Sequence, residues 1–111
     1  MHELAITENI LDIALKHVKG QRITGVYLVI GQWSSIVDDS VQFYWDTISK
    51  GTLAEGAHLH FRHIPTLLQC RDCDLRFTPT QDNYTCPDCG SLRIKVIEGE
   101  EFYLESIEVL T

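Results

Sequence analysis

The stretch CRDCDLRFTPTQDNYTCPDCG, residues 70–90, contains all four cysteines of the chain as two C-x2-C pairs. Cys70 and Cys73 form the first pair, and Cys86 and Cys89 form the second. Two intervening residues let both thiolates of a pair reach one ion, and two pairs complete a tetrahedral shell. Two disulfides are the alternative, which a reducing cytosol disfavours. The spacing therefore predicts a structural zinc site.

Four thiolates leave no open coordination position, so this zinc should support folding rather than catalysis. Pro87 and Gly90 suit the tight turn around the second pair. Metal binding to such a module contributes on the order of 10 kcal/mol or more to its folding. We expect a zinc-ribbon-like module over residues 66–97, where four basic residues balance four acidic ones.

The segments on either side of the module predict two helices. Residues 4–18 have an amphipathic pattern, and Gly20 suits the helix end. Asp38, Asp39 and Ser40 offer capping and first-turn acids for a second helix that Gly51 ends. The apolar stripes of the two helices are Leu4, Ile10, Leu11, Ala14, Leu15 and Val18, and Val41, Tyr44, Trp45 and Ile48.

Three further stretches predict strands, at residues 22–31, 57–64 and 101–110. The first is apolar on both faces, and the second alternates apolar and polar residues. The last is too apolar to stand alone, so it should return to the sheet of the first two. The expected fold is an α+β or α/β sandwich with two helices on a three-stranded sheet. Residues 1–65 plus 98–111 would form this discontinuous domain, with the cysteine module inserted.

The composition of the chain disfavours some classes of function. The chain of 111 residues has a net charge of −7, and the acidic excess lies outside the module. An acidic chain without a basic stripe is a poor partner for nucleic acid. No apolar run is long enough to span a bilayer, and no secretory signal opens the chain. We therefore expect a cytoplasmic protein.

The N-terminal tripeptide MHE offers a second set of metal ligands. The Met1 amine and the His2 amide nitrogen would form a five-membered chelate ring, and the His2 amide and Nδ1 a six-membered ring. Glu3 could supply a fourth ligand through its amide or carboxylate. Planar, nitrogen-rich ligation suits Ni(II) or Cu(II) and suits zinc poorly. The tripeptide alone is explained more simply by a surface histidine and an acid at a helix start.

The remaining histidines and tryptophans predict no further site. His58 and His60 share one face of a strand, with His63 on the other. A solvated face opposite Glu105 and Glu108 of the last strand is the expected setting. The two tryptophans, Trp33 and Trp45, are expected in the core. The sequence has no phosphate-binding glycine loop and no nucleophile beside a base, so it does not favour an enzyme.

The whole set of motifs resembles the hydrogenase nickel-incorporation protein family, HypA. The resemblance runs the full length of the chain and combines several motifs with the two cysteine pairs. These motifs are MHEL at the start, GQWS at residues 31–34, GTLAEG at residues 51–56 and SIE at residues 106–108. The combination is specific, whereas a single zinc knuckle is common.

The resemblance implies a nickel metallochaperone, not an enzyme. It implies a nickel site of Met1, His2 and Glu3, and structural zinc at the four cysteines. The implied partners are the GTPase HypB, the precursor of the nickel–iron hydrogenase large subunit and, in some organisms, the urease accessory proteins. It leaves a monomer or a dimer open. The alternative is a zinc-ribbon adaptor or nucleic-acid-binding module without nickel transfer, which should show a basic face.

Overall fold

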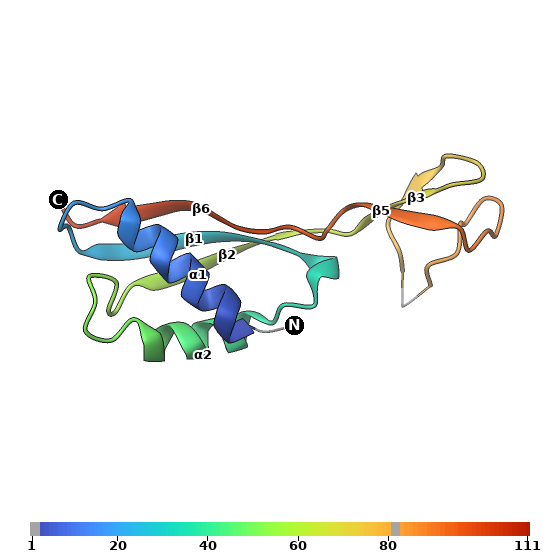
Figure 1. Cartoon of the computed structure of the whole chain (residues 1–111). Coiled ribbons are helices and arrows are strands. Elements are labelled where there is room, and N and C mark those ends of the chain that lie inside the picture. Colours follow the sequence, from blue (N-terminus) through green and yellow to red (C-terminus); the bar gives the residue numbers. More distant parts are fainter. Residues whose placement is uncertain (1–2, 81–82) are drawn as a thin grey trace.

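A computed structural model describes residues 3–80 and 83–111. The molecule is elongated, with extents of 55 × 23 × 17 Å, and has the helices and long strands at one end and the cysteine module at the other (Figure 1). The helices are α1 (Glu3–Lys16), the short 3-10 helix η1 (Gln32–Ser34) and α2 (Asp38–Ile48). The strands are β1 (Ile23–Gly31), β2 (His58–Ile64), β3 (Leu67–Cys70), β4 (Arg76–Phe77), β5 (Ile94–Glu98) and β6 (Phe102–Val109).

The larger sheet has the strand order β2-β1-β6. The central strand β1 runs parallel to β2 and antiparallel to β6. Because β6 follows the cysteine module in sequence, its pairing with β1 confirms that the last strand returns to the sheet of the first two. The predicted fold, two helices with a three-stranded sheet and an inserted cysteine module, is confirmed.

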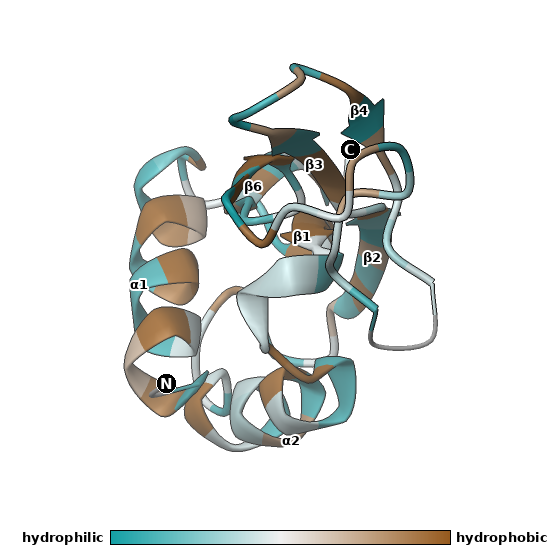
Figure 2. Ribbon diagram, turned by 90° about the vertical axis from the view of Figure 1, so that its right-hand side faces the viewer, coloured by the Kyte–Doolittle hydropathy of each residue, from teal (hydrophilic) through white to brown (hydrophobic). Residues whose placement is uncertain are grey.

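The core lies between this sheet and the two helices. Val26 and Leu28 of β1 are fully buried, and they pack with Trp45 of α2, which is also buried. Figure 2, seen along the long axis, shows hydrophobic segments on both helices beside the strands. Val29, on the opposite side of β1, is buried as well. The prediction that β1 is buried on both faces is therefore confirmed.

Three local predictions were wrong. Trp33 lies in η1 with 38% of its surface exposed, so it is not a core residue. Leu4, at the start of α1, is exposed too, because the helix reaches the core only from Thr7 onwards. The residue before α2 is Val37, and no side chain caps this helix, although Asp38 and Asp39 do lie in its first turn as predicted. The Asp38 carboxylate instead forms a hydrogen bond with Nε2 of the His63 ring at 3.0 Å.

A second sheet, of order β4-β3-β5, builds the cysteine module. Both outer strands are antiparallel to β3. These strands were not predicted, because runs of two to five residues are too short for their hydrophobic period to be recognised. Leu68 of β3 is buried and gives the module a small apolar centre.

The turn after β1 joins the two ends of the molecule. The Trp33 backbone N–H donates to the carbonyl of Gly99 at 2.7 Å, and the Thr66 N–H donates to the Gln32 side-chain oxygen at 3.2 Å. Trp33 also makes an edge-to-face contact with Tyr84 of the module, with ring centroids 5.2 Å apart. The turn therefore contacts both segments that enter and leave the module. None of the helices in the described part of the chain is long and apolar enough to cross a membrane.

Candidate metal centre

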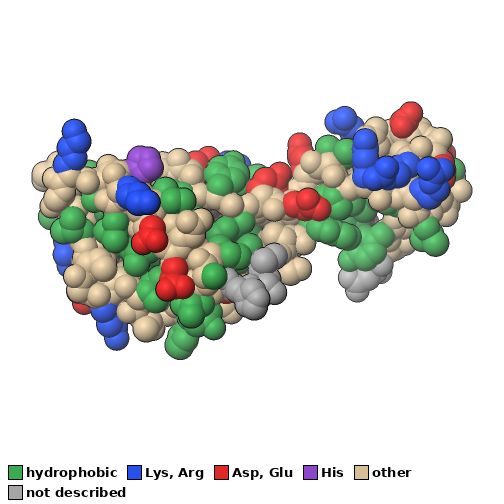
Figure 3. Space-filling view, viewed as in Figure 1, with side chains coloured by type: hydrophobic (Ala, Val, Ile, Leu, Met, Phe, Trp, Pro, Cys, Tyr) green, Lys and Arg blue, Asp and Glu red, His purple; other side chains and the backbone are tan. Residues whose placement is uncertain are grey.

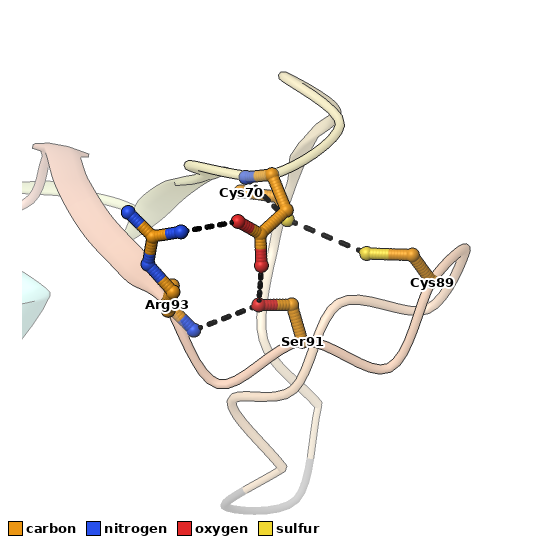
Figure 4. A network of polar contacts seen from close by, with 5 residues as sticks. Cys70, Cys89, Ser91 and Arg93 are labelled. Carbon is orange, nitrogen blue, oxygen red and sulfur yellow. Dashed lines mark hydrogen bonds and ion pairs between the residues drawn. The ribbon is translucent and has the colours of Figure 1, made fainter.

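The four cysteines meet at one point of the module. Their sulfur atoms all lie within 4.8 Å of one another. The sulfurs of Cys70 and Cys89, joined by a dashed line in Figure 4, lie 3.6 Å apart, and those of Cys73 and Cys86 lie 3.5 Å apart. Tetrahedral zinc with Zn–S bonds of about 2.3 Å requires sulfurs roughly 3.8 Å apart, whereas a disulfide requires about 2.05 Å. The four sulfurs are free thiols whose spacing fits a four-thiolate zinc site.

The two cysteine loops have the same backbone geometry. In each, the N–H of the first cysteine donates to the carbonyl five residues later, and the N–H four residues later donates back to the cysteine carbonyl. These pairs are Cys70 with Leu75 and Asp74 in the first loop, and Cys86 with Ser91 and Gly90 in the second. Asp74 and Gly90 both have left-handed backbones, with φ of 63° and 74°. The tight turn predicted at Gly90 is present, and the first loop makes it without glycine.

Local hydrogen bonds spread the pKa values of the thiols. The backbone N–H of Cys89 lowers the pKa of Cys86 to about 7. The Leu75 backbone lowers the pKa of Cys73, but the hydrogen bond with Cys86 and desolvation outweigh this effect and raise that pKa to about 12. Because the thiolate is the metal ligand, zinc would replace these protons. Cys70 and Cys86 are buried, so the site is closed on one side by the protein.

A polar brace joins the two loops beside the sulfurs (Figure 4). Arg93 donates from Nη1 to the Asp72 carboxylate at 2.7 Å, and the Ser91 hydroxyl donates to the same carboxylate. The Arg93 backbone N–H donates to the Ser91 hydroxyl oxygen at 3.0 Å. Asp72 lies inside the first cysteine pair, whereas Ser91 and Arg93 follow the second. Sequence reasoning missed this brace, for which the only signal was the balance of charges within the module.

The predicted nickel ligands lie at the start of α1. Met1 and His2 lie outside the described residues. Glu3 is the first residue of α1, and its carbonyl accepts a hydrogen bond from the Thr7 hydroxyl at 2.6 Å. The assignment of these three residues to nickel stays a prediction.

The histidines of β2 gather no further metal ligands. His58 and His60 are exposed, as predicted, and the His60 ring stacks on Tyr27 with centroids 4.4 Å apart. In the sheet, β1 lies between the strand of these histidines and the strand of Glu105 and Glu108. Glu108 accepts a hydrogen bond from Tyr27 of β1, and Glu105 pairs across β1 with Arg62 of β2, both at 2.8 Å. Within residues 3–80 and 83–111, only the four cysteines bring three or more metal-binding side chains together.

Charge is distributed unevenly over the surface. Figure 3 shows Lys and Arg side chains gathered on one face of the cysteine module. Acidic side chains lie over the larger end and over the neck, the narrow part between the larger sheet and the module. Although residues 66–97 have equal numbers of basic and acidic side chains, the basic ones therefore lie together on one face.

Comparison with known proteins identifies the family. Residues 1–109 match the family model described as hydrogenase/urease nickel incorporation, metallochaperone, hypA. A hydrogenase maturation factor HypA of Dehalococcoides mccartyi is 41% identical, over 98% of this chain and 94% of that protein. Another, from Nostoc sp., is 43% identical over 98% of this chain and 96% of the relative.

Solved structures agree in fold. The solution structure of the Ni metallochaperone HypA from Helicobacter pylori is similar with a TM-score of 0.68 and 25% identity, over 99% of this chain and 98% of that one. A second solution structure, of a HypA protein, gives a TM-score of 0.72 and 26% identity, covering 99% and 97%. These proteins are maturation factors and metallochaperones, not enzymes. The sequence, the fold and the four-cysteine cluster agree, and the chain belongs to the hydrogenase/urease nickel-incorporation metallochaperone family, HypA.

Proposed function

We propose that this chain carries Ni(II) at its N-terminus and holds a structural zinc at Cys70, Cys73, Cys86 and Cys89. The nickel ligands are the Met1 amine, the His2 amide and imidazole, and Glu3. The nickel-binding domain comprises residues 1–65 plus 98–111, and the zinc module comprises residues 66–97. The protein acts by transfer of the ion, without catalysis.

The closed cluster of four sulfurs is the observation that supports separate roles for the two metals. Four converging thiols surround a metal completely, so such a site retains its ion and stabilises the module. A transferable ion needs an open site with few ligands. The start of α1 offers one, because the first N–H groups of a helix have no intrahelical partner and Glu3 adds a carboxylate there.

Membership of this family supports a proposal for where the nickel is delivered. We propose delivery to the precursor of the nickel–iron hydrogenase large subunit in the cytoplasm, together with the GTPase HypB. A role in urease maturation through its accessory proteins is the second destination that the family description suggests.

Nickel calorimetry on the native chain, two altered chains and a control tests the nickel site. The native chain should bind one equivalent of Ni(II). His2→Ala should lose this binding, and so should a chain with one residue added before Met1, because the addition converts the amine into an amide. His58→Ala is the matched control, since His58 is an exposed histidine of β2. Unchanged nickel affinity in His2→Ala would sink the proposal.

A zinc-ribbon adaptor that binds nucleic acid is the second candidate. The basic face of the module in Figure 3 is the observation that favours it. Fluorescence anisotropy with a single-stranded oligonucleotide separates the two functions, because phosphate binding falls steeply with salt. Retained nickel binding without salt-dependent oligonucleotide binding supports the metallochaperone.

A further inference from the structure

A groove runs between α1 and the edge of the larger sheet. Its main part encloses about 810 Å³ and continues into a smaller hollow of about 160 Å³. Both parts are lined by Ile13 of α1 and Leu104 of β6, so they follow one another along the strand. Ile6 and Ile10 extend the helical wall. The groove therefore has one apolar helical wall along its length.

The other wall is the free edge of β6. Phe102, Tyr103 and Leu104 all line the main part, although alternate residues of a strand point to opposite faces. The hollow therefore follows the strand itself over these three consecutive residues. The strand order β2-β1-β6 places that edge on the side away from β1.

The backbone of this edge is available for pairing. The Gly31 N–H donates to the Glu101 carbonyl at 2.6 Å, so Glu101 and, by alternation, Tyr103 direct their backbone groups toward β1. Phe102 and Leu104 then direct their N–H and C=O groups outward. Within the described residues, neither makes a backbone hydrogen bond to an element other than its own sheet.

The groove also has a defined electrostatic character. Among the residues that the structure describes, Glu100 is the only charged one that lines its main part, where Asn9 and the Ser34–Ser35 pair add polar groups. Figure 3 shows hydrophobic side chains reaching the surface on the side of the molecule that carries α1, with acidic side chains around them. An acidic end on an apolar groove fits a segment that is apolar and ends in a basic residue.

We propose that this groove binds an extended segment of a partner protein as a fourth, antiparallel strand on β6. In an antiparallel pair, residues that exchange hydrogen bonds lie directly opposite and point to the same face. Phe102 and Leu104 pack on the helix-covered face, so the partner residues bonded to them insert apolar side chains beneath α1. A Lys or Arg two residues further on, toward the C-terminal end of the segment, reaches Glu100.

The proposal is independent of metal binding. It concerns the face of α1 that bears Ile6, Ile10 and Ile13, and none of these is a proposed ligand. Because α1 begins at Glu3, a bound segment would nevertheless lie along the helix whose first turn carries the proposed nickel site. A variant can thus lose nickel binding and keep segment binding, or the reverse.

A synthetic peptide tests the mode of binding. The probe is acetyl-Thr-Val-Thr-Val-Thr-Lys-amide, in which the two valines lie opposite Leu104 and Phe102. It should shift the amide NMR signals of both residues and the fluorescence of the half-exposed Trp33, which lines the groove. N-methylation of both valines should weaken binding about tenfold or more, because it removes the hydrogen bonds to β6. N-methylation of the flanking threonines, whose N–H groups face solvent, should change affinity much less.

Charge reversal tests the orientation. Glu100→Lys should weaken the binding of the peptide that ends in Lys and strengthen the binding of a peptide that ends in Glu. A double-mutant cycle would measure this coupling. Thr47→Lys on α2 is the control, since Thr47 is exposed and does not line the groove. The same NMR titration should reproduce the shifts in nickel-free protein.

Three results would overturn the proposal. The first is the absence of saturable shifts at Phe102 and Leu104 up to about 1 mM peptide, the affinity of a weak specific site. The second is equal weakening by valine and threonine methylation, which would mean that the peptide binds only through its side chains. The third is a concentration-dependent dimer that the peptide does not disrupt, which would assign the groove to a second copy of the chain.

Discussion

The backbones of Gly31 and Gly99 touch where β1 ends and the chain leaves the cysteine module. A Cβ placed on Gly31 would lie 2.0 Å from the Gly99 carbonyl oxygen and 2.6 Å from the Glu100 nitrogen. Real Cβ atoms do not approach backbone so closely, so only glycine allows this contact. The contact fixes how the strand that carries the core meets the segment that leads into β6.

Gly31→Ala should therefore destabilise the chain by about 1–3 kcal/mol, as overpacking does, because backbone must move. Urea denaturation measures this change. Gly25→Ala is the matched control on the same strand. Its Cβ would lie 2.7 Å from a Glu108 carboxylate oxygen, which is the end of a flexible side chain and can move aside. Equal losses in the two variants would contradict the prediction.

Cys73→Ala should abolish zinc binding and unfold residues 66–97 while largely sparing α1. The remaining three thiols cannot close the tetrahedral shell, and the small module depends on its metal for folding. Metal analysis gives the zinc content, and hydrogen exchange distinguishes the two ends of the molecule. Thr78→Ala, an exposed change in the same module, should leave both unchanged. Zinc-free protein with a protected module would show that the site is not structural.

Asp72→Ala should speed zinc loss to a chelator without abolishing zinc binding. It removes the brace from Arg93 and Ser91 between the two cysteine loops but leaves all four sulfurs. The ion pair is solvent-exposed, so the cost to stability should be about 1 kcal/mol or less. Asp88→Ala removes an acid from the corresponding position of the second pair and serves as the control. If both variants lose zinc at the same rate, the brace has no role in retention.

Nickel affinity should fall as the pH is lowered. Protons compete with the metal for the imidazole, whose reference pKa is about 6.5, and for the terminal amine at about 7.7–8.0. Both ligands bind nickel in their deprotonated form, so affinity should decline from about pH 8 downward and most steeply once both are protonated. Calorimetry between pH 6 and 8 measures this change, for which about tenfold per unit is expected for each proton displaced. A flat profile would exclude both nitrogen ligands.

The sequence predicted the features with long periodic patterns or fixed spacing. The strands at residues 22–31 and 57–64 and the two helices have several turns or alternations, so their burial patterns could be recognised. The cysteine pairs predicted a cluster because the C-x2-C spacing itself imposes the geometry. Gly90 was expected in a tight turn, and its φ of 74° agrees.

Three of the misses depend on contacts between residues distant in sequence. Trp33 looked like a core residue, but its exposure follows from the turn that contacts Gly99 and Tyr84. Asp38 looked like a helix cap, and its carboxylate pairs with His63, twenty-five residues away. The brace at Asp72 forms only when the two cysteine loops fold together.

The double connection through the neck has a thermodynamic consequence for the larger end of the molecule. Leu67 pairs with Glu98, so the folded module holds the two chain ends that lead to β2 and β6 side by side. Without zinc, residues 66–97 would become a flexible loop, and bringing the ends of a loop of this length together costs roughly 3 kcal/mol. Zinc in the module would thus remove a chain-entropy penalty from the pairing of β1 with β6, so that an ion bound at one end of the molecule would stabilise the sheet at the other without touching it.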